Sequence, residues 1–308
     1  MTPVSYKHNA AVAERSFGGW DVASLISVGK TDGQTGRIAH QLVDARLSGR
    51  ALASFPGDAP LNLDESYRIQ DRALALYPLR PCGWKVGFIH PGLQDELGSQ
   101  RLSGPIFADA MIDARKIADD SGIMHVPVFA GGSAAIEAEF ICELAHDVPV
   151  GKFEWTMADV QSIVGSIYAG IEIAGSPVPD INGLGPTYVA ADFGNNAGLI
   201  LGPAIVRWRD LDFQTLATST TIDGKCVGVG TAASVPGTPL ESVRYLLGHL
   251  ARRGHRLCAG DLISTGATTG VHDVIVGQKV SVEFTGRKIF NLLITARSVT
   301  AENGYAHV

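Results

Sequence analysis

The strongest constraint on the fold comes from residues 134–144, an apolar stretch in which Glu137 and Glu139 stand two positions apart. A period of two is that of a β-strand, so both carboxylates share one face. The other face is apolar and consists of Ile136, Ala138, Phe140, Cys142 and Leu144. Residues two apart in a strand are separated by about 7 Å, so the two carboxylates can converge on one cation.

Two like charges in an apolar segment are costly unless a positive charge lies between them. A hard metal ion would supply that charge. The alternative is a half-solvated strand with Glu137 and Glu139 on its wet face.

The composition is that of a well-packed globular protein. The chain has 308 residues, of which 45% are hydrophobic, and can form one large domain or a small domain beside a large one. Its 36 glycines favour the tight loops of mixed β structure. The net charge is -6 and no basic cluster is present, which argues against nucleic-acid binding.

The first 30 residues carry charged side chains, among them Lys7 and Glu14, without an unbroken apolar stretch. They resemble neither a signal peptide nor a membrane anchor, so we expect a cytoplasmic protein with no membrane partner. Four cysteines without a Cys-x-x-Cys pair argue against a thiolate metal site and a disulfide framework. The chain lacks a dinucleotide fingerprint and a Walker loop, which argues against a nucleotide cofactor.

The pattern divides the chain into an N-terminal arm with a helical subdomain, residues 1–80, and a metal-binding mixed β domain, residues 81–308. We expect a polar arm to about residue 30, a helix over 34–47, and a second helix that Asp64 caps. Later helices are expected from Thr156 through Ile167, with Asp159 in a capping box, and over 240–253. Strands are expected over 261–265, 279–284 and 288–295, the last two joined by a turn at 285–287.

Three further residues could carry chemistry. Glu172 follows a predicted helix within an apolar stretch, and with Glu137 and Glu139 it would give three carboxylates, a ligand set that favours magnesium or manganese over zinc. Lys85 shares a strand face with Gly87, which leaves room for a ligand near its ammonium group. Asp109 is a carboxylate in a loop-like stretch. The alternative for Glu172 is an exposed glutamate on a strand, and the alternative for Lys85 is a surface lysine. The alternative for Asp109 is a turn or cap residue.

Two glycine-rich segments, residues 194–202 and 259–270, join polar residues to apolar runs. Such segments supply backbone donors and small hydroxyls to a pocket, although tight turns alone can explain them. The candidate substrate-binding residues are Asn196, Ser264, Thr265, Gly266 and Thr268.

Taken in order, these segments resemble the fumarylacetoacetate hydrolase superfamily, and within it the 2-keto-4-pentenoate hydratase and 4-oxalocrotonate decarboxylase branch. The matching stretches are residues 63–70, 83–87, 136–149, 171–173, 196–202 and 259–270. The resemblance implies an α+β fold, a mixed, twisted β-sandwich or roll with a small helical N-terminal part. It also implies homo-oligomers, and a complex with another enzyme of the same pathway is a further expectation.

The resemblance implies that Glu137, Glu139 and Glu172 hold Mg²⁺ or Mn²⁺. A 2-keto acid would bind this metal through its keto oxygen and one carboxylate oxygen. Lys85 and Asp109 match pocket residues with catalytic roles. Lys85 would add positive charge near the enolate, and Asp109 would transfer a proton or activate water.

The activity implied is hydration of a 2-hydroxy-2,4-dienoate, similar to 2-keto-4-pentenoate, to a 4-hydroxy-2-keto acid in aromatic meta-cleavage catabolism. One alternative is a 4-oxalocrotonate-type decarboxylase of a 2-keto dicarboxylic acid. Its second carboxylate would require a further cationic group, which the sequence does not identify. Another alternative is a catalytically silent partner subunit or binding protein with the same fold.

Overall fold

The structure, a computed structural model, describes the backbone of residues 22–116, 122–285 and 287–298. Side chains are described for residues 33–116, 122–285 and 289–298. Residues 1–21 of the expected polar arm and Gly286 of the expected turn lie outside the described residues.

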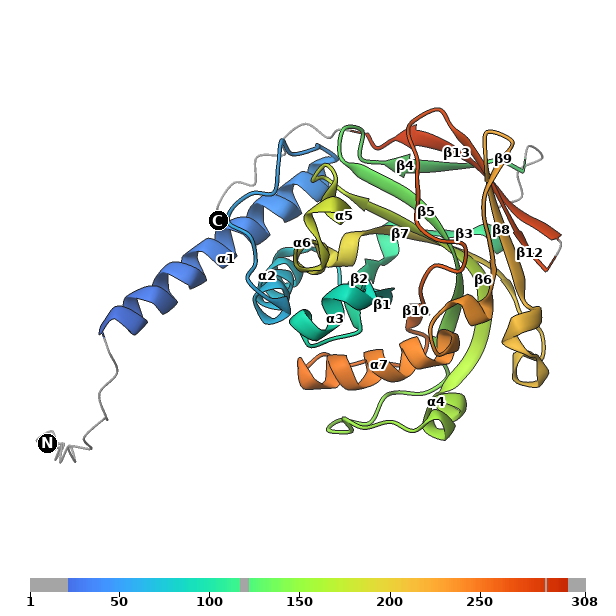
Figure 1. The fold of residues 1–308 in the computed structure, drawn as a ribbon, viewed down its shortest axis with the longest axis horizontal. Coiled ribbons are helices and arrows are strands. Elements are labelled where there is room, and N and C mark those ends of the chain that lie inside the picture. Colours follow the sequence, from blue (N-terminus) through green and yellow to red (C-terminus); the bar gives the residue numbers. More distant parts are fainter. Residues whose placement is uncertain (1–21, 117–121, 286, 299–308) are drawn as a thin grey trace, which may run out of the picture.

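An eight-stranded sheet forms the centre of the molecule, in the order β2-β1-β10-β5-β6-β7-β3 with β11 paired to β5. Its strands are β1 (Pro81–Phe88), β2 (Arg101–Phe107), β3 (Met111–Asp113), β5 (Ser133–Leu144), β6 (Val164–Ser176), β7 (Asn196–Ala204), β10 (Leu262–Ser264) and β11 (His272–Asp273). The long strands β5 and β6 pair antiparallel and curve through the body of the molecule (Figure 1).

A second sheet of five strands has the order β4-β13-β12-β8-β9. Its strands are β4 (Met124–Val128), β8 (Ala217–Ile222), β9 (Lys225–Thr231), β12 (Lys279–Phe284) and β13 (Arg287–Ala296). The apolar face of β5 and β6 belongs to the same core as the buried side chains of β12 and β13. Phe140 and Phe284 make an edge contact within it, with ring centroids 5.4 Å apart.

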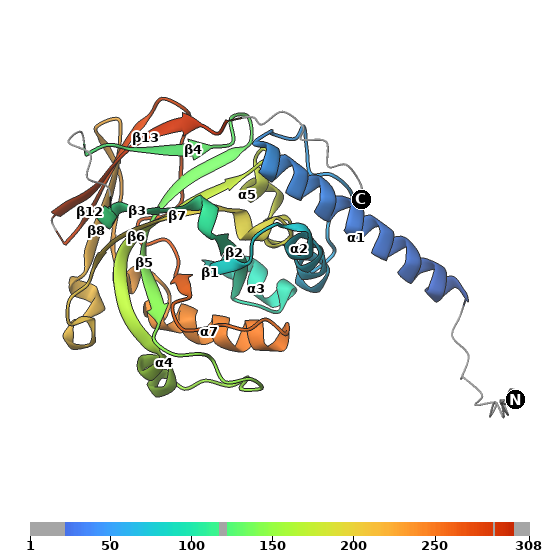
Figure 2. The ribbon, with the colours of Figure 1, turned by 180° about the vertical axis from the view of Figure 1, so that it is seen from behind.

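The α-helices are α1 (Val22–Ser48), α2 (Leu63–Leu76), α3 (Pro91–Leu97), α4 (Met157–Ile163), α5 (Ile181–Leu184), α6 (Pro186–Ala191) and α7 (Thr238–Arg252). Short 3-10 turns are η1 (Ala108–Ala110), η2 (Ala114–Lys116), η3 (Phe193–Asn195), η4 (Trp208–Asp210), η5 (Phe213–Thr215) and η6 (Ala232–Ser234). In both views α1, α2 and α5 gather on one side and the five-stranded sheet lies on the other (Figures 1 and 2). A second core joins α1, α2 and α6 to β2.

The structure confirms the α+β class, and the strands expected over 279–284 and 288–295 correspond to β12 and β13. The helix expected over 240–253 is α7, and Thr156 and Asp159 form the expected capping box at the start of α4. None of the helices in the described part of the chain combines the length and apolarity that a membrane crossing requires.

Three local expectations are wrong. Helix α1 starts at Val22 rather than near residue 34, and Asn62 rather than Asp64 caps α2, its side chain accepting from the Glu65 amide at 2.9 Å. The helix expected from Thr156 through Ile167 ends at Ile163, and β6 begins at Val164. Val164 and Ile167 are β-branched and contribute to the core, and such side chains pack well on a pleated surface.

Candidate metal centre and substrate cavity

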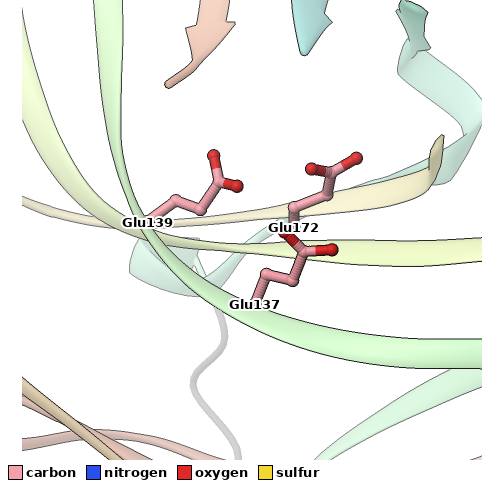
Figure 3. A group of neighbouring side chains, drawn as sticks. All are labelled: Glu137, Glu139 and Glu172. Carbon is pink, nitrogen blue, oxygen red and sulfur yellow. The ribbon is translucent and has the colours of Figure 1, made fainter. Parts of the chain in front are cut away.

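Three glutamates project from neighbouring strands to one side of the sheet. Glu137 and Glu139 lie on β5, and Glu172 lies directly opposite Glu137 on β6. Figure 3 shows the three side chains extending from these strands toward a common region. One carboxylate oxygen from each residue lies within 4.8 Å of the others, which is close enough for all three to bind one ion.

The carboxylates are buried, so the alternative of a half-solvated strand with these glutamates facing water is wrong. Glu139 and Glu172 are 0% exposed and Glu137 is 6% exposed. The opposite face of β5 lies in the main core, as the period of two predicts. Both faces of this strand are therefore shielded from water.

Hydrogen bonds hold two of the carboxylates and leave one oxygen of each without a hydrogen-bond partner. Ser264 Oγ and the Gly266 amide donate to Glu139 Oε2 at 2.6 and 2.9 Å. Asn196 Nδ2 donates to Glu172 Oε1 at 3.0 Å. Among the described residues, Glu139 Oε1 and Glu172 Oε2 have no hydrogen-bond partner. Buried oxygens in this state suit a cation.

Lys85 supplies positive charge to the site but not enough to balance three carboxylates. Its Nζ lies 3.4 Å from Glu172 Oε2, and the residue is 5% exposed, so the surface-lysine alternative is also wrong. Burial opposes the charged form of Lys85, yet the three neighbouring glutamates together raise its pKa. The ammonium group is therefore held charged beside the carboxylates.

The three carboxylates repel one another when no further cation is present. Burial, and then the charge of Glu172, raise the pKa of Glu137 to about 8. Burial and the neighbouring carboxylates also raise the pKa of Glu139 well above its ordinary value. A divalent cation would remove this repulsion, and an all-oxygen ligand set is the one that Mg²⁺ and Mn²⁺ prefer. The residues present therefore fit such an ion.

A cavity of about 260 Å³ opens beside this group, with Lys85 and Glu137 among its lining residues. Arg101, Ser242 and Thr265 also line it. The cavity is large enough for a small organic acid and carries both charged and apolar walls.

The five predicted substrate-binding residues lie in three kinds of surroundings. Thr265 and Gly266 line the cavity, although the Thr265 hydroxyl donates to the Phe140 carbonyl at 2.7 Å. Ser264 and Asn196 contact the carboxylates, as described above. Thr268 Oγ1 donates to the Ala138 carbonyl at 2.7 Å and connects the loop to β5. The structure therefore places most of these polar groups where they support β5 and β6.

Asp109 is not brought to the carboxylates. It lies in η1, is exposed, and accepts a hydrogen bond from the Tyr77 hydroxyl at 3.3 Å. Lys85 pairs with Gly104 of β2, and the cavity reaches β2 at Arg101 and Leu102, on the other side of Gly104 from Asp109. β2 runs from Arg101 toward η1, and Asp109 lies outside the lining of the cavity.

Two buried arginines were not identified from the sequence. Arg46 of α1 donates to Asp192 Oδ1 and to the Asn196 carbonyl, both at 2.6 Å, and so connects the helical part to the site. Its position four residues after Leu42 continues the buried stripe of α1, a signal that could have identified it. Arg101 lines the cavity, and nothing in its local sequence distinguishes it from a surface residue.

The chain is similar in sequence to two kinds of enzyme. No family model matches the chain. The chain is 30% identical over 245 residues to a 2-keto-4-pentenoate hydratase of Burkholderia vietnamiensis (strain G4 / LMG 22486), covering 77% of this chain and 88% of that one. It is 35% identical over 254 residues to a 4-oxalocrotonate decarboxylase of Pseudomonas putida, covering 81% and 92%.

Among solved structures, the fold is similar to that of 4-oxalocrotonate decarboxylase from Pseudomonas putida G7 complexed with magnesium and adipate. The TM-score is 0.68 at 21% identity, over 85% of this chain and 98% of that one. This likeness confirms the expected mixed β architecture.

Proposed function

The chain belongs to the 2-keto-4-pentenoate hydratase and 4-oxalocrotonate decarboxylase branch of the fumarylacetoacetate hydrolase superfamily, and from this membership we propose a divalent-metal-dependent hydratase. Its substrate would be a 2-hydroxy-2,4-dienoate and its product a 4-hydroxy-2-keto acid. The observation that carries this proposal is the buried group of Glu137, Glu139 and Glu172, which lacks balancing charge beside a cavity.

Glu137, Glu139 and Glu172 would hold Mg²⁺ or Mn²⁺, and the solved relative named above contains magnesium. When bound, such an ion supplies Lewis acidity that polarises a 2-keto acid and favours its enolate. Ser264 and the Gly266 amide orient Glu139, and Asn196 orients Glu172. Supporting hydrogen bonds of this kind fix ligand geometry before substrate arrives.

Lys85 is the residue of the cavity that we assign to the substrate's developing negative charge. Its Nζ is held beside Glu172 and faces a cavity that also contains Glu137. A fixed ammonium group in a site with little water stabilises an enolate more than the neutral substrate. Lys85 Nζ can also donate the proton that carbon receives, a role that the position of Asp109 does not support.

The test is chelation followed by addition of Mg²⁺, assayed with 2-hydroxypenta-2,4-dienoate. We expect activity to disappear on chelation and to return with the metal. Full activity in a sample verified as metal-free would contradict the proposal. Restored metal content without turnover of any 2-keto acid would favour the catalytically silent alternative.

A decarboxylase of a 2-keto dicarboxylic acid is the second candidate, because the cavity contains a further cationic side chain, Arg101. The relative that is 35% identical has this activity by name. Release of carbon dioxide from a 2-oxohexenedioate, without hydration of the monocarboxylic dienoate, would favour this reaction.

A further inference from the structure

Asn195 is a buried amide in the wall of the cavity. It ends η3, is 3% exposed, and lines the cavity together with Asn182 of α5. Its Nδ2 donates to Asn182 Oδ1 at 3.1 Å. Its Oδ1 has no hydrogen-bond partner in any part of the chain that the structure describes. A buried acceptor without a donor is costly, so this oxygen suits a donor that arrives with the substrate.

The backbone at Asn195 is held in a conformation that most residues avoid. Phe193, Gly194 and Asn195 have φ angles of 54°, 63° and 63°, all in the left-handed region. Glycine and asparagine adopt this region readily, whereas phenylalanine does so only when its surroundings impose it. Phe193 is 1% exposed and belongs to the helical core, which fixes the turn. The position of the Asn195 amide is therefore set by the fold.

This turn packs against the lysine of the site. A Cβ atom on Gly194 would lie 3.0 Å from Lys85 Cδ, which is closer than side chains normally approach. Asn195 directly follows Gly194, and the next residue, Asn196, donates to Glu172. Asn195 therefore lies in the chain between a residue that contacts Lys85 and one that orients a candidate metal ligand.

The chemistry of the proposed reaction leaves one group for this acceptor. The keto and carboxylate oxygens of a 2-keto acid are themselves acceptors. Hydration forms a bond between the oxygen of a water molecule and C4 of the substrate. One hydrogen of that water ends on C3, and the other stays on the oxygen as the 4-hydroxyl. The water and the 4-hydroxyl are therefore the donors that a neutral amide oxygen can accept from.

We propose that Asn195 Oδ1 accepts a hydrogen bond from the water that adds to C4, and then from the 4-hydroxyl of the product. The amide does not act as a base, because it holds the water by the hydrogen that the oxygen keeps. Decarboxylation adds no water, so this contact is specific to hydration. The inference rests on the proposed function, because it assumes that the keto-acid end binds at Glu137, Glu139 and Glu172.

The experiment is calorimetric titration of the full chain, in excess Mg²⁺, with 2-oxopentanoate and with each enantiomer of 4-hydroxy-2-oxopentanoate. These acids differ in the 4-hydroxyl alone. We expect the wild type to bind one enantiomer about fivefold more tightly than 2-oxopentanoate, which is the usual effect of one buried hydrogen bond. Asn195→Gly keeps the left-handed backbone. It should abolish this preference and change the affinity for 2-oxopentanoate less than about twofold.

Two further variants test whether the oxygen acceptor is responsible. Asn195→Asp retains a side-chain oxygen and tolerates the same backbone, so it should keep the preference. Arg207→Gly changes another residue with a left-handed φ, 56°, that lies outside the lining of the cavity. It should bind all three acids as the wild type does.

A kinetic measurement separates water addition from the preceding tautomerisation. In D₂O, Asn195→Gly should still catalyse deuterium incorporation at C5 of 2-hydroxypenta-2,4-dienoate, because tautomerisation adds no water. Hydration of the same substrate should be slower by about tenfold or more. A residue with a purely structural role would slow both steps together.

The outcomes distinguish this inference from the proposed function. Equal affinity of the wild type for all three acids, or equal weakening of all three by Asn195→Gly, would overturn the role of Asn195 alone. Parallel loss of deuterium incorporation and hydration would do the same. Failure of every acid to bind the wild type in excess Mg²⁺ would overturn the proposed function as well. The wild-type comparison needs no variant, so it tests the inference even if Asn195→Gly does not fold.

Discussion

Three carboxylates within 4.8 Å of one another repel strongly when buried, and the single ammonium group of Lys85 leaves most of that repulsion uncompensated. Their repulsion therefore lowers the stability of the metal-free protein, and the same buried negative charge gives the site its affinity for a cation. Removal of the metal should make this cost measurable.

The stability of the metal-free protein should depend on pH through Glu137. The pKa of Glu137 is about 8 in the folded state, against an ordinary value of 4.5. Between these values the folded state binds more protons than the unfolded state, so the free energy of unfolding falls as pH rises from about 4.5 to 8. Saturating Mg²⁺ should remove this loss. Chemical denaturation at several pH values, with and without chelator, measures it.

Glu137→Gln is the control, because glutamine does not titrate. Buried His249, whose pKa is lowered to about 3 mainly by burial, makes stability rise with pH up to its ordinary value of 6.5. The difference between wild type and Glu137→Gln isolates the glutamate from this opposing effect. A difference that stays constant from pH 4.5 to 8 would show that Glu137 is not the source.

Ser264 should influence metal affinity without contacting the metal. Its hydroxyl donates to Glu139 Oε2 at 2.6 Å, and Ser264→Ala leaves that oxygen with the Gly266 amide alone. Loss of such a supporting bond typically weakens metal binding about 10- to 100-fold. Titration with Mg²⁺ tests this, with Ser162→Ala on α4 as the control. Unchanged affinity in Ser264→Ala would place the metal elsewhere.

At the residue scale the sequence predicts the carboxylates well because their signal is local. Glu137, Glu139 and Glu172 stand in apolar strands whose period is visible in a few residues. The positions of Asp109 and Arg101 depend instead on which end of β2 faces the cavity. That direction follows from the pairing of β1 with β2 and β10, which no local pattern contains.

At the scale of elements, the pair β5 and β6 fixes the site and α1 supports it. Arg46 of α1 is 6% exposed, forms a buried ion pair with Asp192 and donates to the carbonyl of Asn196. The Asn196 side chain in turn donates to Glu172. A helix remote in sequence therefore helps to orient a candidate metal ligand.

Arg46→Met should destabilise the protein and weaken metal binding together. Removing one partner of a buried ion pair leaves the other charge uncompensated, at a cost of about 3–5 kcal/mol. Urea denaturation measures the stability, and Mg²⁺ titration of the folded variant measures the affinity. Arg68→Met, on the exposed face of α2, should change neither. Undiminished stability in Arg46→Met would contradict this account of the connection.

The elements themselves were predictable where local signals were strong. The capping box of Thr156 and Asp159 and the apolar stripe of α7 both have their expected structures. The end of α4 was not predictable from local signals, because Val164 and Ile167 fit a helical period but pack in the sheet core. Tertiary packing decided between two patterns that the same residues satisfy.

At the scale of the whole molecule, two sheets enclose one core and the helices α1, α2 and α6 form another with β2. The order of the matching segments along the chain identified this architecture, whereas composition alone left one or two domains open. The carboxylate face of the larger sheet buries three acidic side chains beside one lysine. We therefore expect metal, substrate and stability to be coupled at that face.

The most direct test is calorimetric titration of the chelated protein with Mn²⁺, for the wild type and Glu139→Gln. We predict one ion bound per chain in the wild type and at least a 100-fold loss of affinity in the variant. Glu143→Gln, on the same strand but outside the group of three carboxylates, is the matched control and should bind as the wild type does. Equal Mn²⁺ affinity in Glu139→Gln and the wild type would contradict the assignment of Glu137, Glu139 and Glu172 as the metal centre.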